Sequence, residues 1–422
     1  MLKQPHQPQT FDVVMLNMSA YSEWQRGIAN RNFFLLHALL RHPRIRKVLA
    51  VDYLPYTFRR AGRQWVQDVA LGPGGTVLDR GPLHRLVAVR ASEIERTGYH
   101  IGGGDGREVP YRLFVLSDVS SVQSEASAYQ HIRQAAERLG FRNTILWSYL
   151  PTFSGYLGAV PHVVSVFDAV DNWVEHAAYA SVRERLRLNY ETIRRSVDVV
   201  FATSPDLVRF FDRPQATFVP NGVDIDLVAS VPNLVGRDIA KLPRPIVGYV
   251  GTLQADRIDV PLLESVVAAN PRKSFVVVGS GGLTWPSFSR RTELRLPQHP
   301  NLHLVGRKSF RESRAYVREF AVGTIPHLVN EFNRYTNPMK LYEYLAAGKP
   351  VVATRTAGFE QLGHLVHLAS TPDEFNEAVL QALQEHSSEQ VMQRQAAARE
   401  HSWQRRLEVM LGEIDGVLAT RV

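Results

Sequence analysis

The stretch EFNRYTNPMKLYEYLAAGKPVVAT, from Glu331 to Thr354, decides the fold of this chain. Asn337 followed by Pro338 is typical of a helix start, with asparagine as the N-cap and proline at the first helical position. The predicted helix ends at Gly348, and the apolar run from Val351 to Ala353 predicts a buried strand. A loop, a helix and a buried strand in this order are the repeating unit of an α/β fold.

The start of this helix carries the groups that bind a phosphate. A helix N-terminus offers unpaired N–H groups and partial positive charge, and Lys340 adds a full charge on the first turn. Glu343 lies three residues later on the same face, where a carboxylate can accept hydrogen bonds from ribose hydroxyls. Together they predict a site for a nucleoside diphosphate. The alternative is an exposed ion pair between Lys340 and Glu343, followed by an ordinary helix stop.

The same alternation of strands and helices recurs in both halves of the chain. It predicts an α/β protein with two doubly wound domains, joined by the proline-interrupted stretch 231–245, whereas the glycine-rich stretch 56–110 breaks the pattern. The predicted strands are Phe11–Leu16, Val48–Val51, Leu86–Val89, Leu113–Leu116, Thr144–Trp147, Val163–Phe167, Val199–Ala202, Ile246–Val250, Ser274–Val278, Leu302–Val305, Val322–Pro326, Val351–Thr354 and Leu365–Leu368. The predicted helices are Ala29–Arg41, Ser124–Leu139, Val182–Ser196, Val260–Ala269, Arg311–Arg318, Met339–Ala347, Pro372–Glu385 and Trp403–Leu418.

Length and composition fit a two-domain globular protein. The 422 residues suit two domains of about 200 residues each. The absence of cysteine suits a reducing cytoplasm. The N-terminus lacks the apolar stretch of a signal peptide, and no apolar run reaches the roughly 18 residues of a membrane span. We therefore expect a cytoplasmic protein, soluble or peripheral on the inner face of the membrane.

The chain is basic, with 49 Lys+Arg against 41 Asp+Glu and a net charge of +8. An anionic membrane, a nucleic acid or a phosphorylated substrate would match this charge. The arginines of the predicted helix 182–196 form either an ordinary solvated face or a lipid-contacting patch, and they are Arg183, Arg185, Arg187, Arg194 and Arg195. No basic patch interleaved with aromatic residues stands out, so nucleic acid is not expected as a partner.

Three segments in order carry a family resemblance. They are Val219–Asp224 (VPNGVD), Pro245–Leu253 (PIVGYVGTL) and Leu341–Val352 (LYEYLAAGKPVV). On these segments the chain resembles the GT-B glycosyltransferases, especially the GT4-like bacterial group. The resemblance implies two Rossmann-like domains facing across a cleft, 1–230 for the acceptor and 231–402 for the donor, with a C-terminal helix, 403–422, packing back on the first domain.

The resemblance also implies an activity and its partners. The expected reaction moves a sugar from a nucleoside-diphosphate sugar to a hydroxyl of a sugar or lipid-linked acceptor, in polysaccharide or glycolipid biosynthesis. A nucleotide-sugar 2-epimerase of the same fold and a non-catalytic binding protein are the alternatives. The irregular stretch 56–110 fits a bulky acceptor better than the tight cleft of an epimerase.

The donor residues are expected on the rim of the second domain. Gly251 lets backbone approach a diphosphate, and Arg257 can neutralise charge on the leaving group. Many members of the family hold the phosphates with an arginine and a lysine in place of a metal ion, so Arg257 and Lys340 imply a site without metal or other cofactor. The predicted donor-binding residues are Gly251, Thr252, Arg257, Asn333, Thr336, Asn337, Pro338, Lys340 and Glu343.

The chain departs from the family at one position. Retaining GT4 enzymes typically carry a glutamate eight residues before the helix glutamate, and here that position is Tyr335. Glu331 is the nearest carboxylate upstream. Asn333, Arg334 and Thr336 therefore become candidates for contact with sugar hydroxyls, and the stereochemical outcome is left open.

Acceptor and base residues are expected on the first domain. Gln25, Arg26 and Gly27 lie between the first strand and the first helix, where Arg26 can hold a phosphate. Asp168 and Asp171 follow a predicted strand and are candidates for the general base of an inverting enzyme. In a retaining enzyme the leaving phosphate can take the proton. Helix capping is the alternative role for both aspartates.

Overall fold

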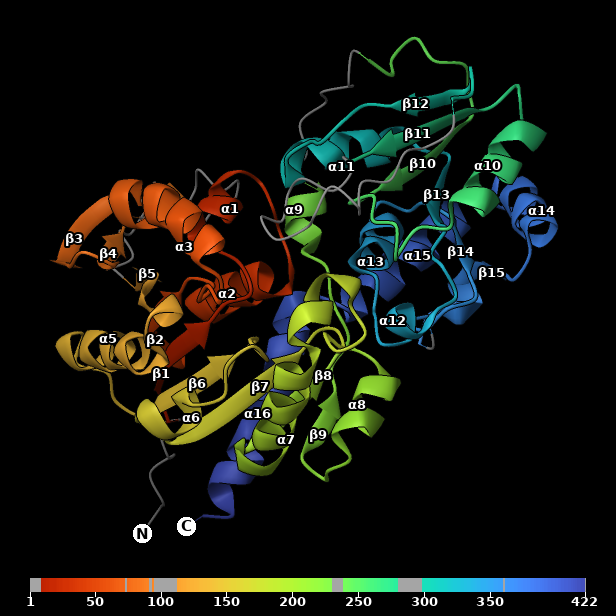
Figure 1. Ribbon diagram of the computed structural model, residues 1–422. Coiled ribbons are helices and arrows are strands. Elements are labelled where there is room, and N and C mark those ends of the chain that lie inside the picture. The colour runs from red at the N-terminus through yellow and green to blue at the C-terminus, as the bar shows by residue number, and fades with distance from the viewer. Residues whose placement is uncertain are drawn as a thin grey trace.

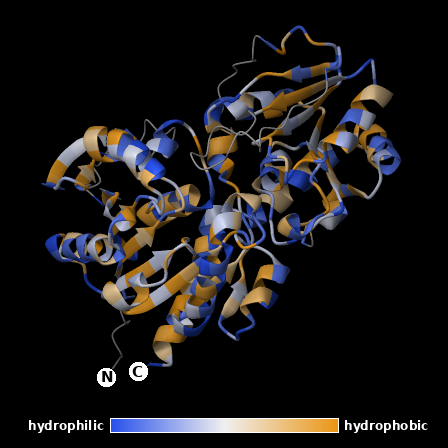
Figure 2. Cartoon of the chain, viewed as in Figure 1, coloured by the Kyte–Doolittle hydropathy of each residue, from blue (hydrophilic) through white to orange (hydrophobic). Residues whose placement is uncertain are grey.

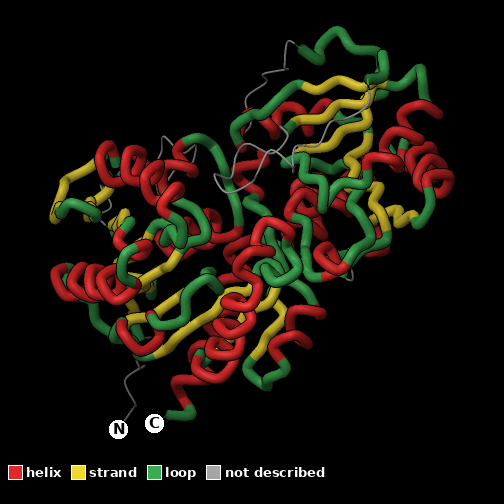
Figure 3. Tube along the Cα trace, in the orientation of Figure 1, coloured by secondary structure: helices red, strands yellow, loops and turns green. Residues whose placement is uncertain are grey.

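The computed structural model describes residues 9–72, 74–90, 93–94, 112–229, 238–279, 298–359 and 361–421. It contains two open sheets, each covered by helices on both faces (Figures 1 and 3). The glycine run 102–106, residues 231–237 of the predicted linker and Ser280 to Gly282 lie outside the described residues.

The first sheet has the strand order β3-β4-β5-β2-β1-β6-β7-β8-β9. Its strands are β1 (Phe11–Leu16), β2 (Ile45–Val51), β3 (Gly75–Arg80), β4 (His84–Val89), β5 (Leu113–Asp118), β6 (Thr144–Ser148), β7 (Val164–Ala169), β8 (Val199–Ala202) and β9 (Ala216–Phe218). From β5 to β9 all neighbours are parallel, while β4 is antiparallel to both β3 and β5. Its helices are α1 (Tyr21–Gln25), α2 (Arg31–Arg41), α3 (Phe58–Gln64), the π-helix η1 (Trp65–Leu71), η2 (Ser120–Val122), α5 (Glu125–Arg138), α6 (Tyr156–Ala159), η3 (Ala177–Val182), α7 (Arg183–Ser196) and α8 (Pro205–Phe211).

The second sheet has the strand order β12-β11-β10-β13-β14-β15, and all its neighbours are parallel. Its strands are β10 (Ile246–Val250), β11 (Ser274–Val278), β12 (Leu302–Leu304), β13 (Val322–Ile325), β14 (Val351–Thr354) and β15 (Val366–Ala369). The remaining helices are α9 (Ile225–Ala229), α10 (Val260–Ala269), α11 (Phe310–Glu319), α12 (Glu331–Arg334), α13 (Met339–Ala346), η5 (Gly363–Leu365), α14 (Pro372–Ala382), α15 (Ser388–Glu400) and α16 (Trp403–Ala419).

Both sheets reverse their strand order beside their first strand. The reversal lies between β1 and β6 in one domain and between β10 and β13 in the other. Parallel strands buried on both faces read as continuous apolar runs, and β1 and β11 are buried at every residue. Ligands of open α/β sheets bind beyond the carboxyl ends of the strands at such reversals. The two reversals therefore set the position of the site.

The donor helix begins at Met339, the start of the predicted range, but its N-cap differs from the predicted one. Pro338, not Asn337, is the N-cap residue of α13, and it makes no side-chain capping bond. Asn337 uses its side chain elsewhere: its Oδ1 accepts from the Asn221 N–H at 2.8 Å, and its Nδ2 donates to the Gly358 carbonyl at 3.0 Å. The helix ends at Ala346, and Gly348 follows with a left-handed φ of 72°.

The glycine-rich stretch 56–110 holds more regular structure than the sequence predicts. Besides β4 it contains α3, the π-helix and the edge strand β3, and residues 95–111 lie outside the described part. Strand β3 escapes prediction because it is an edge strand whose residues are mostly exposed, so it lacks a buried apolar face.

The last helix returns to the first domain (Figure 1). The apolar face of α16 joins the core of the first sheet, with Trp403, Leu407, Met410 and Ile414 all buried. The Trp403 ring stacks on Phe34 at 5.4 Å between centroids. Beside it, the Trp403 N–H donates to the Val223 carbonyl at 3.2 Å, so the two chain crossings between the domains lie side by side.

The arginines of α7 have partners within the protein. Arg185 pairs with Glu125 at 2.6 Å, and the Arg183 Nε donates to the Val174 carbonyl at 2.9 Å. The other three pair with glutamates on their own helix: Arg187 with Glu184, and Arg194 and Arg195 with Glu191. This arrangement matches an ordinary solvated helix face. Within the described residues, no helix is both long enough and apolar enough to span a bilayer.

Replacing Trp403 with alanine should lower the free energy of unfolding by about 3–5 kcal/mol, because it empties a fully buried site between α16 and α2. Val409 lies on the same helix with 47% of its surface exposed, and Val409→Ala should change stability by less than about 0.5 kcal/mol. Urea denaturation followed by circular dichroism compares the two variants. Equal losses would contradict the packing of α16 on the first domain.

Candidate active site

A cavity of about 390 Å³ lies between the two domains, within the usual range for ligand sites. The first domain contributes Met18, Gly27, Ile28, Ala29, Asn30, Arg31, Val170, Asp171, Trp173, His176, Tyr179 and Asn221. The second contributes Tyr249, Val250, Gly251, Thr252, Gln254, Arg257, Val278, Gly279, Arg307, Lys308, Phe310, Ser313, Arg314, Thr336, Asn337, Pro338, Met339, Lys340 and Glu343. These residues follow the carboxyl ends of several strands, as the topology requires.

The loop after β10 lies close against the donor helix. Gly251 has a φ of 153°, and a Cβ there would lie 2.7 Å from the Tyr249 hydroxyl and 3.2 Å from Lys340 Cε. A side chain at Gly251 would therefore displace Tyr249 or Lys340. Glycine at this position lets the backbone at residue 251 and the side chain of Lys340 lie next to each other on one wall of the cavity.

Lys340 is held by two neighbours. Its Nζ lies 3.4 Å from Nε2 of His327 and 5.0 Å from the centroid of the Tyr249 ring. Burial, together with Lys340 and Arg257, keeps the pKa of His327 well below its ordinary value, so this histidine is neutral and its Nε2 can accept. Burial also lowers the pKa of Lys340 to about 7, and the charge of Arg257 adds to this effect.

The first turn of α13 lies at the same wall. Pro338 provides no side-chain cap, and Met339 and Lys340 line the cavity. Uncapped N–H groups at a helix N-terminus attract an anion. The turn and the Lys340 ammonium group therefore form one anion-binding wall.

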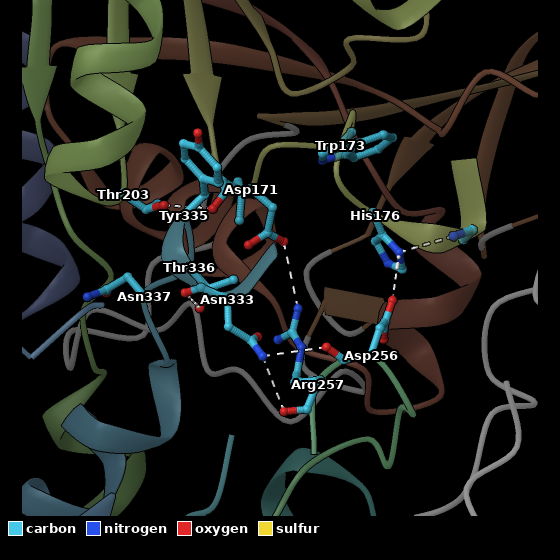
Figure 4. A network of polar contacts seen from close by, with 12 residues as sticks. Asp171, Trp173, His176, Thr203, Asp256, Arg257, Asn333, Tyr335, Thr336 and Asn337 are labelled. Atoms are coloured by element: carbon cyan, nitrogen blue, oxygen red, sulfur yellow. Dashed lines mark hydrogen bonds and ion pairs between the residues drawn. The ribbon is translucent and has the colours of Figure 1, made fainter. Parts of the chain in front are cut away.

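Arg257 faces the cavity from the second domain (Figure 4). Its Nη2 lies 4.0 Å from the Asp171 carboxylate across the domain boundary, and its guanidinium group lies 5.2 Å from the Phe332 ring centroid. Its Nε is buried without a hydrogen-bond partner. Burial raises the pKa of Asp171, against the opposing effect of Arg257. The long, loose ion pair leaves this arginine able to bind a ligand anion.

A second pair crosses the domain boundary beside the first (Figure 4). His176 Nδ1 lies 3.2 Å from the Asp256 carboxylate. Burial would raise the pKa of Asp256, but the hydrogen bond from His176 and the charges of His176 and Arg257 outweigh it, so the net shift is downward. Asp256 and Arg257, which are adjacent in one loop of the second domain, thus contact His176 and Asp171 of the first domain, one through a carboxylate and the other through a guanidinium group.

Glu343 pairs with an arginine from another helix. Arg314 of α11 lies 2.5 Å from the Glu343 carboxylate, and its guanidinium group stacks 3.9 Å from the Phe310 ring centroid. Arg314 is 3% exposed, so this pair is buried. Glu343 therefore lines the cavity with its carboxylate oriented by Arg314, so it is paired with Arg314 and not with Lys340.

Asp168 lies away from the cavity. It belongs to β7, its carboxylate is fully buried, and Arg31 Nε donates to both of its oxygens at 2.9 and 3.0 Å. Burial raises the pKa of Asp168, against the opposing charge of Arg31. Unlike Asp171, it cannot reach a ligand between the domains. Its carboxylate positions Arg31.

Asn333 is also structural. It is fully buried, and its side-chain amide donates to the carbonyls of Leu328 at 2.9 Å and Arg257 at 3.3 Å (Figure 4). It fixes the loop that carries Arg257 without lining the cavity itself. Thr336 lines the cavity, and its hydroxyl donates to the Asn333 carbonyl at 2.9 Å.

The carboxylate upstream of Tyr335 lies outside the cavity. Glu331 is exposed at the start of α12 and pairs with Arg334 at 3.5 Å. Arg334 also pairs with Asp206 at 3.2 Å. The Tyr335 carbonyl accepts from the Ser204 hydroxyl at 3.1 Å, which ties this loop to the first domain. Neither Glu331 nor Arg334 is placed to contact a sugar in the cavity.

The predicted acceptor loop is divided. Gly27 lines the cavity with a φ of 79°, and its carbonyl accepts from the Phe310 N–H of the second domain at 3.0 Å. A Cβ at Gly27 would lie 2.6 Å from Cβ of Ser309. Gln25 and Arg26 do not line the cavity, and Arg26 is exposed with its Nε donating to the Ser22 carbonyl at 3.1 Å. Arg26 is therefore not placed to bind a phosphate in this cavity.

Besides Arg307 and Lys308, which also line the cavity, sequence patterns missed three charged residues of the site: Arg31, His176 and Arg314. Each owes its position to a partner more than 25 residues away in the chain, at Asp168, Asp256 and Glu343. The one available signal was an arginine at the start of the otherwise apolar helix α2. Among the described residues, no group of histidines and carboxylates could hold a metal ion.

Comparisons with known proteins agree with this architecture. Residues 244–385 match the family model described as "Glycosyl transferases group 1". The chain is 30% identical over 143 residues to the "Putative teichuronic acid biosynthesis glycosyltransferase TuaH" of Bacillus subtilis (strain 168), and the match spans 34% of this chain and 35% of that protein. The family resemblance is thus confirmed for the second domain.

Solved structures match nearly the whole chain. A sucrose-phosphate synthase from Thermosynechococcus elongatus has a TM-score of 0.63 at 14% identity, over 97% of this chain and 100% of that one. HepE from Anabaena, solved in complex with UDP-glucose, has a TM-score of 0.59 at 12% identity, over 95% and 99%. At these identities the likeness shows the fold, and the predicted GT-B architecture is confirmed.

The two aspartates should respond differently to the same substitution. Asp168→Asn leaves the buried Arg31 without its counter-ion and should lower the free energy of unfolding by about 3–5 kcal/mol. Asp171→Asn removes only a partly exposed, 4.0 Å contact and should cost less than about 1 kcal/mol. Chemical denaturation of both variants tests this. A larger loss for Asp171→Asn would reverse the assignment.

Proposed function

We propose that this protein transfers a sugar from a nucleoside-diphosphate sugar to an acceptor hydroxyl, in the assembly of a cell-surface polysaccharide or glycolipid. The observation that carries the proposal is the convergence of Lys340, Arg257 and the uncapped start of α13 on one cavity between two domains. The group 1 glycosyltransferase match in the second domain and the teichuronic acid relative support it.

The diphosphate would lie against the anion-binding wall. Amide groups of the first turn of α13 and of the Gly251 loop would bind its oxygens, with Lys340 on one side and Arg257 on the other. Glu343, oriented by Arg314, would accept hydrogen bonds from the ribose hydroxyls. In this arrangement Arg257 exchanges the loose Asp171 contact for phosphate oxygens.

Transfer breaks the bond between the sugar C1 and the diphosphate oxygen and forms one between C1 and the acceptor oxygen. Negative charge develops on the departing diphosphate, where Arg257 and Lys340 stabilise it. The acceptor proton passes to a carboxylate or to the leaving phosphate. Of the two aspartates considered for this step, Asp171 lines the cavity and Asp168 does not, so we assign the base role to Asp171 if a carboxylate serves.

Two cationic side chains in the phosphate site favour chemistry without a divalent cation. The cavity also favours transfer over epimerisation. Among the described residues, its carboxylates are Asp171 and Glu343, and Arg314 already holds Glu343, whereas an epimerase needs several free acid and base groups. The presence of Lys340 and Arg257 in the cavity argues against a non-catalytic binding protein with a degenerate site.

The proposal is tested by incubating the protein with UDP-, GDP- and dTDP-sugars and candidate acceptor saccharides, and by measuring nucleotide release and thermal shift. HepE, solved with UDP-glucose, makes UDP-sugars the first choice. Activity should survive thorough EDTA treatment. No thermal shift with any nucleotide would overturn the proposal, and complete loss in EDTA would overturn its metal-free form.

Lys340→Ala should lower turnover at least about tenfold with the fold intact, because it removes charge stabilisation from the leaving group. Lys241 is an exposed lysine of the same domain, and Lys241→Ala serves as the matched control with unchanged turnover. Steady-state kinetics of both variants measure the effect. Normal turnover in Lys340→Ala would place the phosphates elsewhere.

Binding of UDP should be linked to the protonation of Lys340. Its pKa of about 7 leaves much of the free protein with a neutral amine at mildly alkaline pH, and the bound diphosphate favours the charged form. UDP affinity should therefore fall as the pH rises through about 7 to 9, with proton uptake on binding. Calorimetry in buffers of different ionisation enthalpy measures this uptake. Lys340→Arg stays charged and should abolish it; uptake that persists in that variant would contradict the assignment.

A further inference from the structure

The helix that follows β2 exposes its largest apolar side chains to solvent and buries several polar ones. Residues 58–71 form one continuous helical segment, first α3 and then the π-helix η1. Its polar side chains Arg60, Gln64 and Asp68 are buried at 3–5% exposure. Its four largest apolar side chains face outward, while the smaller Ala61 and Val69 are buried: Phe58 and Leu71 are each 71% exposed, Val66 is 52% and Trp65 is 42%. An ordinary surface helix places these classes of side chain the other way round.

The inversion is fixed by hydrogen bonds on the inner face. The Gln64 side-chain amide donates to the Tyr53 carbonyl at 2.9 Å, and Arg60 Nε donates to the Gln64 oxygen at 3.3 Å. The Arg60 guanidinium group stacks 3.6 Å from the Tyr53 ring centroid. Gln64 and Arg60 thus tie the inner face of the helix to Tyr53, and a rotation that buried Phe58 and Trp65 would break both contacts. Their exposure is a built feature of the fold.

Exposed apolar side chains concentrate at this place. Five of the eleven large apolar residues exposed among the described residues lie between Phe58 and Val77, on α3, η1 and the adjoining edge strand β3. Trp65 ties its polar edge to the protein, since its Nε1 donates to the Pro82 carbonyl at 2.7 Å, and presents its ring. Figure 1 shows α3 and β3 at the outer end of the first domain, and Figure 2 shows hydrophobic and hydrophilic residues side by side there.

Charge identifies the kind of surface that fits. Residues 57–90 contain six arginines and two aspartates, with no lysine or glutamate, a net charge of +4. Asp68 is buried and Asp79 lies 3.3 Å from His84, whereas Arg59, Arg80 and Arg90 are exposed. Outward phenylalanine, tryptophan and leucine among arginines are what binds the interface of an anionic bilayer.

We propose that the face formed by α3, η1 and β3 docks the first domain onto an anionic lipid bilayer. This face is separate from α7, whose arginines are paired within the protein. Its inner side backs onto the cavity wall, because the ring of Tyr56, next to α3, lies 6.2 Å from that of Tyr179, which lines the cavity. Resting on the proposed function, docking here would hold the cavity beside a lipid-carried acceptor.

Flotation with vesicles tests the docking without any enzyme activity. The protein should float with phosphatidylcholine vesicles containing about one third phosphatidylglycerol, less with phosphatidylcholine alone, and less at about 0.5 M salt. The double variant Phe58→Ser/Leu71→Ser should lower the partition coefficient about tenfold or more while keeping the wild-type melting temperature, since both side chains are exposed. Leu188→Ser/Arg195→Gln on α7, whose leucine is 62% exposed, is the matched control and should bind as wild type.

Three results would overturn the proposal: no flotation of the wild type with anionic vesicles, equal flotation of the Phe58→Ser/Leu71→Ser variant, or a wild-type dimer in sedimentation velocity that this variant dissociates, which would assign the face to a second copy. Transfer to a water-soluble acceptor should be unchanged in the variant. If vesicles bind and no sugar nucleotide turns over, the proposed function fails while the docking stands.

Discussion

The buried pair between Arg31 and Asp168 is the constraint on which the site depends. Arg31 starts α2, and besides Asp168 it donates through Nη1 to the Pro220 carbonyl at 3.2 Å and to Oδ1 of Asn221 at 3.3 Å. Asn221 in turn donates two hydrogen bonds to Asn337, from its N–H to Oδ1 at 2.8 Å and from its Nδ2 to the carbonyl at 2.6 Å. This series of bonds runs from the first sheet through the chain crossing to the start of α13. Desolvation offsets much of the attraction in a buried ion pair, so this pair contributes mainly by fixing the positions of its residues and less by adding stability.

The contacts between the two domains at the rims of the cavity are looser or more exposed than the buried Arg31–Asp168 pair. Asp171 and Arg257 are 4.0 Å apart, and His176 and Asp256 are 3.2 Å apart with partial exposure. A ligand anion that competes for Arg257 therefore acts on a contact between domains. Binding and the spacing of the domains are linked by this exchange, because a ligand shifts a conformational equilibrium only by its differential contacts. The buried bonds of Arg31 hold the two domains together, whereas the looser contact between Asp171 and Arg257 can exchange with a ligand.

The sequence predicted the parallel strands well because they are buried on both faces. β10, β11 and β14 have the predicted bounds, since continuous apolar runs mark such strands without reference to partners. Edge strand β3 and the inverted helix after β2 lack that signal, as their outward residues break the expected pattern. Within the site, Lys340 and Glu343 line the cavity as predicted, because one helix turn fixes their relation.

The sequence could not distinguish structural carboxylates from ligand-facing ones, because they differ only in the residues they pair with. Strand β7 runs to Ala169, two residues beyond the predicted end, and this extension buries Asp168 while Asp171 lies on the loop beyond it. Glu343 likewise has its partner on α11, a helix that no local pattern connects to it. A carboxylate with a close, buried arginine is committed to structure or orientation, as the 2.9 and 2.5 Å contacts of Asp168 and Glu343 show. Asp171, at 4.0 Å from its arginine and on the wall of the cavity, is not committed in this way.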